Sequence, residues 1–152
     1  GFWSNLVHLP EANINPVPTD LAEPQLAAAA YEREIQLQAG ANPAFDIILL
    51  GMGDDGHTAS LFPHTAALSV RDQLVTVGDK DGQPRITFTF PFINNARSVM
   101  FLVSGENKQA ALTEVFAPTG DADTYPSRSI QPQGELLWLL DAAAGEGLIH
   151  NS

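Results

Sequence analysis

The chain has 152 residues, 18 acidic and seven basic, and its formal charge of −11 argues against a nucleic-acid partner and against docking on an anionic membrane. It contains no cysteine, which excludes a disulfide scaffold, a thiolate metal site and a cysteine nucleophile. The hydrophobic share of 44%, the lack of a bilayer-length apolar run and the lack of a signal-peptide pattern predict a cytoplasmic chain forming one folded domain or most of one.

The first predicted helix begins near Asp20. Residues 1–18 contain three prolines and show no hydrophobic period, so we expect a loop there with at most one short helix. Asp20–Glu23 resembles a capping box, and Pro24 falls in the first turn, where no backbone donor is missed. Gly40 ends the helix soon after Gln38.

The middle of the chain is rich in predicted strands. Phe45–Leu50 is almost wholly apolar, which is typical of a parallel strand covered on both faces. A glycine-rich loop follows, after which Thr58–Phe62 can begin a helix. Gln73–Val77 favours a strand, and Arg85–Phe90 alternates strictly between polar and apolar residues. Turns are expected at residues 79–84 and 91–95.

The last third repeats the order of strand and helix. Ser98–Val103 predicts a second buried strand, and a helix is expected from Glu106 to about Phe116. A long loop over Pro118–Pro132 leads to a last strand at Glu135–Leu140 and a short terminal helix. Strands that alternate with helices predict an α/β fold with a mostly parallel sheet. Ligands of such sheets bind beyond the carboxyl ends of the strands, which selects the loops after Leu50 and Val103.

The loop after Leu50 carries the strongest candidate chemistry. Gly51 and Gly53 let the backbone turn sharply and approach a ligand. Asp55 and His57 are two residues apart, so the carboxylate can orient the imidazole as a general base. From the spacing alone, a helix-capping aspartate beside an unrelated histidine is an equal alternative.

Two other interpretations of this loop are weaker. A metal site would use Asp54, Asp55, His57 and His64, but their spacing matches no known ligand pattern. The residues from Gly51 to Gly56 fit the G-x-G-x-x-G pattern, yet the adjacent aspartates would repel a pyrophosphate and no acidic residue follows at the required distance.

The loop after Val103 suggests an anion site. Gly105 opens the helix, and Lys108 lies one turn inside it, so free N–H groups and an ammonium would meet a phosphate there. The alternative is a solvated lysine on the helix surface. Arg128, in the long loop, is a second candidate for reaching an anion, although an ordinary surface position is the commoner fate of such a residue.

Three segments resemble one enzyme family. FDIILLGMGDDGHTASLFPHT (residues 45–65) is similar to the signature segment of 6-phosphogluconolactonases. RITFTFPFINNARSVMFLVSGENKQAAL (residues 85–112) resembles that family's next block, and PSRSIQPQGELLWLLDAAA (residues 126–144) resembles its closing strand and helix. The blocks occur in the family's order and cover most of the chain.

The resemblance implies an activity and assigns roles. It implies hydrolysis of 6-phosphoglucono-1,5-lactone, a sugar-phosphate lactone, in the pentose phosphate pathway, on a Rossmann-like α/β fold shared with glucosamine-6-phosphate isomerase/deaminases. No metal and no cofactor are implied. His57 would be the general base, Asp55 would orient it, and Lys108 would help to hold the phosphate. We therefore expect a substrate site formed by Gly51, Gly53, Gly105, Lys108 and Arg128 around the catalytic pair, in a monomer or weak homo-oligomer.

The sequence also departs from the family. Members carry a Gly-Gly-Ser/Thr phosphate loop and an Asp-Glu-Arg segment well before the signature segment, and neither occurs here. We therefore expect residues 1–152 to be the C-terminal part of one such domain, without its first βα units. Three alternatives stay open: an amino-sugar isomerase/deaminase, a non-catalytic sugar-phosphate-binding relative, and an inactive fragment. Against the first, Phe62 stands where the deaminases carry a catalytic glutamate.

Overall fold

A computed structural model describes residues 10–19 and 21–149, and part of the predicted N-terminal loop therefore lies outside the described residues. The helices are η2 (Glu11–Asn13), α1 (Pro24–Ala39), η3 (Ala66–Ser69), α2 (Phe90–Asn94), η4 (Glu106–Lys108), α3 (Gln109–Phe116), η5 (Pro126–Ser129) and α4 (Ala142–Ile149). The strands are β1 (Ile47–Leu50), β2 (Val75–Lys80), β3 (Gln83–Phe88), β4 (Ser98–Val103) and β5 (Glu135–Leu140).

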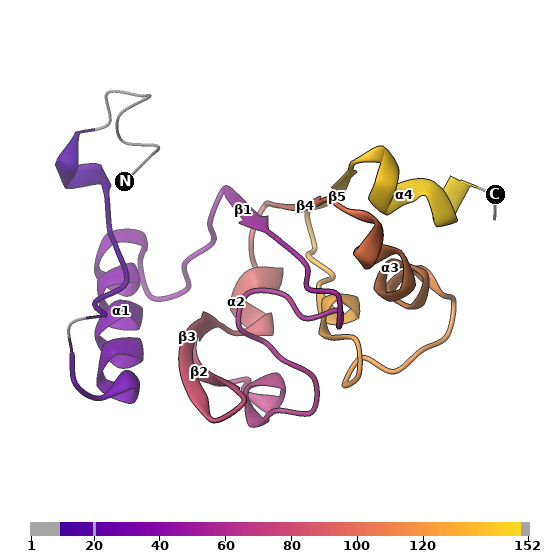
Figure 1. The fold of residues 1–152 in the computed structure, drawn as a ribbon. Helices are drawn as coiled ribbons and strands as arrows, with labels where there is room; N and C mark the ends of the chain where they lie inside the picture. Colours follow the sequence, from indigo (N-terminus) through magenta and orange to yellow (C-terminus); the bar gives the residue numbers. More distant parts are fainter. Residues whose placement is uncertain (1–9, 20, 150–152) are drawn as a thin grey trace.

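A parallel sheet of three strands forms the centre of the fold, in the order β1-β4-β5. Ile47 of β1 pairs with Ser98 of β4, and Ser98 pairs with Glu135 of β5. The three parallel strands therefore begin at the same end of the sheet. In Figure 1 the sheet lies between the β2–β3 hairpin below and the helices α3 and α4 at the right. The predicted α/β class with a mostly parallel sheet is confirmed.

The second sheet is an antiparallel hairpin of β2 and β3. Asp81 and Gly82 both have positive φ angles, 54° and 79°, which is the geometry of the tight two-residue turns that match the twist of a hairpin. Asp79 caps this turn by accepting the Gly82 N–H at 2.9 Å. The predicted loop over residues 79–84 is therefore shorter than expected, because both strands continue into it.

Two local predictions are wrong. Thr58–Phe62 does not begin a helix: Ala59 has a φ of 49°, and Thr58 bridges Leu61 across a tight turn. The expected turn at residues 91–95 is largely the short helix α2, which begins after Thr89, whose hydroxyl accepts the Phe92 N–H. The helix expected from Glu106 to about Phe116 is confirmed: it starts as the 3₁₀ turn η4 and continues as α3 from Gln109 to Phe116.

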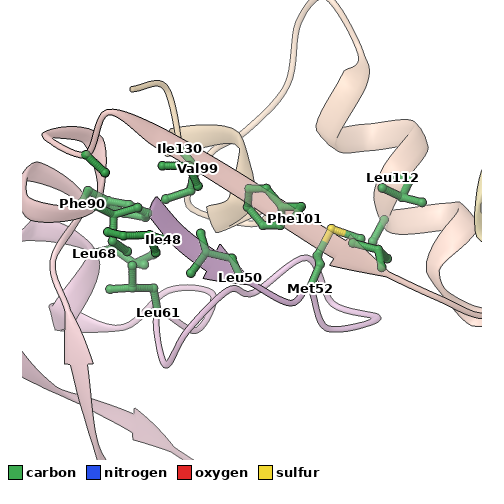
Figure 2. Packing of buried hydrophobic residues seen from close by; sticks show 14 of the residues in the cluster. Ile48, Leu50, Met52, Leu61, Leu68, Phe90, Val99, Phe101, Leu112 and Ile130 are labelled. Atoms are coloured by element: carbon green, nitrogen blue, oxygen red, sulfur yellow. The ribbon is translucent and has the colours of Figure 1, made fainter. Parts of the chain in front are cut away.

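The main core lies against one face of the parallel sheet (Figure 2). Successive side chains of a strand point to opposite faces of the sheet. The core face carries the buried side chains of Ile48, Leu50, Val99, Phe101 and Val103. The indole of Trp138 stacks flat on Phe101 with ring centroids 3.8 Å apart. Figure 2 shows Leu61 and Met52 approaching this face from the loop that follows β1.

The opposite face of the same sheet is largely exposed. Ile47 and Leu49 of β1 are 55% and 62% exposed, and Leu102 of β4 and Leu139 of β5 are 53% and 52% exposed. The paired registers place these side chains on one face. The expectation that Phe45–Leu50 is covered on both faces is therefore wrong for the described residues, because no described element packs on that side of β1.

Helix α1 packs on the hairpin and forms a smaller second core. Ala28 and Ile35 contact a cluster that includes Val75 and Phe92. The carboxylate of Glu32 also accepts the backbone N–H groups of Leu74 and Val75, at 2.8 and 3.0 Å. In the described part of the chain, helices are too short or too polar to cross a membrane.

Candidate active site

Asp55 and His57 form a close pair in the loop that follows β1. The Asp55 Oδ1 atom lies 2.6 Å from Nδ1 of the imidazole and also accepts the His57 backbone N–H at 3.0 Å. One carboxylate oxygen therefore fixes both the main chain and the ring of His57. The side chains are 23% and 47% exposed for His57 and Asp55, so solvent reaches both.

The pair fixes which imidazole nitrogen is free. Partial burial acts to raise the pKa of Asp55, but hydrogen bonds from the His57 backbone and ring, with the attraction of the imidazole, outweigh it, and the pKa of Asp55 lies below its ordinary value. An ionised carboxylate can only accept hydrogen bonds, so Nδ1 carries the proton. Nε2 then bears the lone pair, and no described residue donates to it. This is the arrangement of a general base.

Two glycines allow the close packing of this loop. A Cβ atom on Gly53 would collide with the His57 ring and the Asp55 carboxylate, so the side chains lie directly against this residue's backbone. Gly56 has a φ of 77°, and a Cβ there would lie 2.8 Å from the Tyr125 ring. A Cβ on Gly51, by contrast, would meet no described atom within 4 Å. The close packing of the Asp55–His57 pair is thus enough to require a glycine at position 53.

The other side of the imidazole rests on Phe62. The two ring centroids lie 4.4 Å apart, and the Phe62 side chain is buried. Phe62 reaches this position because Thr58, which is fully buried, donates to the Gly51 carbonyl at 2.8 Å and holds the turn closed. His64 lies beyond this turn with a φ of 58° and forms no part of the pair.

The second predicted loop differs from the expected anion site. The Gly105 N–H, one of the donors assigned to a phosphate, points instead at the carboxylate of Asp141, at 3.1 and 3.2 Å from its two oxygens. The same carboxylate accepts the Ala144 N–H at 2.8 Å and so begins α4. Sequence reasoning missed this contact, which joins residues 36 positions apart. The backbone N–H of the half-buried Lys108 donates to the Gly105 carbonyl at 3.1 Å, whereas its side chain makes no hydrogen bond or ion pair with any described residue.

The guanidinium of Arg128 donates hydrogen bonds to backbone carbonyls of the protein. It donates to the carbonyls of Glu114 and Val115 and, at 3.0 Å, to that of Ala117. These are the last carbonyls of α3, which a helix cannot satisfy internally, so Arg128 caps the end of this helix. These contacts favour the structural alternative for Arg128, and its role as a substrate contact stays a prediction.

The structure brings together some of the predicted residues. Asp55, His57, Gly51 and Gly53 share the loop after β1, and Gly105 and Lys108 lie beyond the adjacent strand β4. The described residues include no group of three histidine, aspartate or glutamate side chains placed to hold a metal ion.

A parallel α/β sheet thus carries a carboxylate-oriented histidine beyond one strand and, beyond the next, a lysine whose side chain has no hydrogen-bond partner among the described residues. Residues 2–138 match the family model described as glucosamine-6-phosphate isomerases/6-phosphogluconolactonase, and the chain belongs to this family.

Similar proteins point in the same direction. The 6-phosphogluconolactonase of Synechocystis sp. is 63% identical over 150 residues, which cover 96% of this chain and 62% of that protein. The Nostoc sp. 6-phosphogluconolactonase is 61% identical over the same shares. Among solved structures, 6-phosphogluconolactonase from Trypanosoma cruzi superposes with a TM-score of 0.80 at 30% identity, covering 92% of this chain and 61% of that one. The chain thus spans about three fifths of the length of these relatives.

Proposed function

We propose that this chain hydrolyses 6-phospho-D-glucono-1,5-lactone to 6-phosphogluconate, in the pentose phosphate pathway, and that it forms the C-terminal portion of a 6-phosphogluconolactonase domain. The observation that carries the proposal is the Asp55–His57 pair, with Nε2 free beyond the carboxyl end of β1. Relatives more than 60% identical carry the name of this enzyme. The cytoplasmic location expected from the sequence stays a prediction.

The proposed reaction needs no covalent intermediate. His57 Nε2 takes a proton from a water molecule as the water oxygen attacks the C1 carbonyl of the lactone, and the carbonyl oxygen becomes an oxyanion. As the oxyanion collapses, the bond between C1 and the ring oxygen breaks. The imidazolium returns its proton to that ring oxygen, which gives the open-chain acid. Asp55 stabilises the imidazolium while it exists, because its carboxylate lies 2.6 Å from Nδ1.

The test compares lactone hydrolysis by the unsubstituted chain with that by His57→Asn and Asp55→Asn, after subtraction of spontaneous hydrolysis. We expect His57→Asn to lower kcat by about 10²–10⁴, or to the background where the starting rate is low. Asp55→Asn should lower kcat with little change in KM, because Asp55 acts through His57. His64→Asn is the matched control, since asparagine tolerates the positive φ of that exposed residue.

Turnover by His57→Asn equal to that of the unsubstituted chain would contradict the proposed lactone hydrolysis by His57. Loss of activity with a chelator, restored by a divalent ion, would contradict the role given to Asp55. The deaminase alternative is tested in parallel by ammonia release from glucosamine 6-phosphate. We expect none, because the buried Phe62 ring that rests on His57 cannot transfer a proton.

A further inference from the structure

The acidic chain poses a problem for binding an anionic sugar phosphate. With a net charge of −11, its overall field repels such a ligand, so a few cations must attract it locally. The chain has seven lysine and arginine residues. Within the described residues, four of them donate hydrogen bonds to protein groups, and these are Arg71, Arg85, Arg97 and Arg128.

The side chains of the other three, Arg33, Lys80 and Lys108, donate no hydrogen bond to a described residue. Arg33 is exposed on α1 and lines a shallow pocket together with Val70 and Thr76, a set that contains no residue of the Asp55–His57 loop. Lys108 follows β4 and is the phosphate contact already expected. Lys80 is the cation whose position in the structure has no role so far.

Lys80 and His57 both lie against the same aromatic ring, that of Phe62. Its Nζ atom sits over the Phe62 ring, 5.6 Å from the centroid, and that ring is 4.4 Å from the His57 ring. The two spans share Phe62, so the ammonium lies no more than about 10 Å from the imidazole, a separation comparable with the length of a six-carbon sugar phosphate.

The hairpin holds Lys80 in this place. Gly78, two residues earlier on β2, lies so close to the Ser60 carbonyl that a Cβ atom would collide with it. The Thr87 hydroxyl of β3 accepts the Ser60 N–H at 3.1 Å. Residues two apart on a strand share a face, so Lys80 and Gly78 both face the loop that carries Phe62. The exposed ammonium then extends from the end of β2 over this loop.

We propose that Lys80 is the second cation of the substrate site and binds the phosphate of the sugar-phosphate ligand together with Lys108. The inference rests on the proposed function and adds to it a contact from the β2–β3 hairpin. A phosphate dianion needs more than one positive charge for compensation. The helix start before Lys108 supplies less than the sequence suggested, because Asp141 already occupies the Gly105 N–H.

The test is a titration of the full chain with 6-phosphogluconate, followed by NMR so that weak binding is measurable. Lys80→Gln should raise the dissociation constant about tenfold, and Lys80→Arg should restore it to within about threefold. Arg33→Gln is the matched control, because it removes the same charge from an exposed side chain away from the site, and it should leave the constant unchanged. Since Lys80 is exposed at the hairpin end, the fold should survive, and a thermal melt of each variant checks this.

A second ligand identifies the group that Lys80 binds. Glucitol 6-phosphate keeps the phosphate but has no carboxylate, so Lys80→Gln should weaken its binding as much as that of 6-phosphogluconate. Weaker binding of 6-phosphogluconate alone would move Lys80 to the carboxylate and overturn the phosphate assignment. An unchanged constant in Lys80→Gln, with a raised one in Lys108→Gln, would remove Lys80 from the site and leave the proposed function intact. If the unsubstituted chain bound neither ligand, the proposed substrate would fall as well.

Discussion

A single carboxylate oxygen of Asp55 organises the candidate catalytic residue. It binds the backbone N–H and the ring of His57 at the same time, so the loop conformation and the imidazole orientation are coupled. Gly53 completes this arrangement because any side chain there would displace the ring. The spacing Gly-x-Asp-x-His therefore has a local structural reason. Gly53 leaves room for the Asp55 carboxylate and the His57 ring, and Asp55 orients His57.

Stability should report this coupling through its dependence on pH. The pKa of Asp55 in the folded chain is lowered from its ordinary value of 3.8, so its ionised form contributes stability above that value and loses it as the pH falls through the folded pKa. Asp55→Asn should melt at a lower temperature than the unsubstituted chain at pH 6, and the difference should shrink below about pH 3.8.

Asp54→Asn provides the control for this measurement, because the neighbouring Asp54 is exposed and makes no hydrogen bond with a described residue. It should melt like the unsubstituted chain at every pH. A melting difference for Asp55→Asn that grows on acidification, or none at pH 6, would show that the Asp55–His57 contact does not stabilise the fold.

Residue-level prediction from the sequence works where partners are close along the chain. Asp55 and His57 are two positions apart, and the turn alone brings them together. The contact of Asp141 with Gly105 joins residues 36 positions apart and depends on how β5 pairs with β4, so no local sequence pattern predicts it. The same holds for Lys80, whose place over Phe62 is set by the hairpin rather than by its sequence neighbours.

At the scale of elements, the predicted strands Ser98–Val103 and Glu135–Leu140 have the observed bounds. Continuous apolar runs of this length have one reasonable place in an α/β fold, which explains the agreement. The turn at Thr58–Phe62 escaped prediction because Ala59 adopts a positive φ, which no residue preference of alanine indicates. The position of Arg128 at the end of α3 could not be predicted either, because a long loop separates it from the three carbonyls to which it donates.

The exposed face of the parallel sheet has a consequence for association. Leu49, Leu102 and Leu139 leave a contiguous apolar strip in water on strands that normally carry a layer of helices. We expect the chain to self-associate through this face. Replacing Leu102 by Lys and Leu139 by Glu keeps the net charge and should increase the monomer fraction in sedimentation velocity. The melting temperature should change little, because both side chains are more than half exposed.

Leu37→Lys is the matched control for this experiment. Leu37 is 73% exposed but lies on α1, away from the parallel sheet. It should leave the sedimentation profile unchanged. A monomeric unsubstituted chain, or equal association in the sheet variant and the control, would show that this face does not drive contacts between copies.

At the scale of the whole molecule, the chain carries the candidate base, Lys80 over the Phe62 ring that packs on this base, and Lys108 beyond the adjacent strand. It covers 62% of the length of its Synechocystis relative. Doubly wound sheets bury both faces, and here one face of β1, β4 and β5 is exposed. A pocket of about 290 Å³ also lies beside β1, lined by residues such as Leu50, Gly51 and Phe88. Under the proposal that the chain is the C-terminal portion of such a domain, the exposed face and this pocket are the places where the rest of the domain would pack.

Supplying that structure in trans should therefore raise activity. We expect the chain alone to hydrolyse the lactone at a small fraction of the rate of the Synechocystis enzyme. The part of that enzyme with no counterpart in this chain, added as a separate polypeptide, should form a 1:1 complex and increase turnover, because it would cover the exposed sheet face and add groups to the substrate site. The increase should be absent with His57→Asn, which separates restored catalysis from spontaneous hydrolysis, and reduced in the variant with Lys and Glu at positions 102 and 139. A monodisperse monomer that turns over the lactone as fast as the Synechocystis enzyme without any addition would contradict the prediction, since the described elements would then suffice for the complete site.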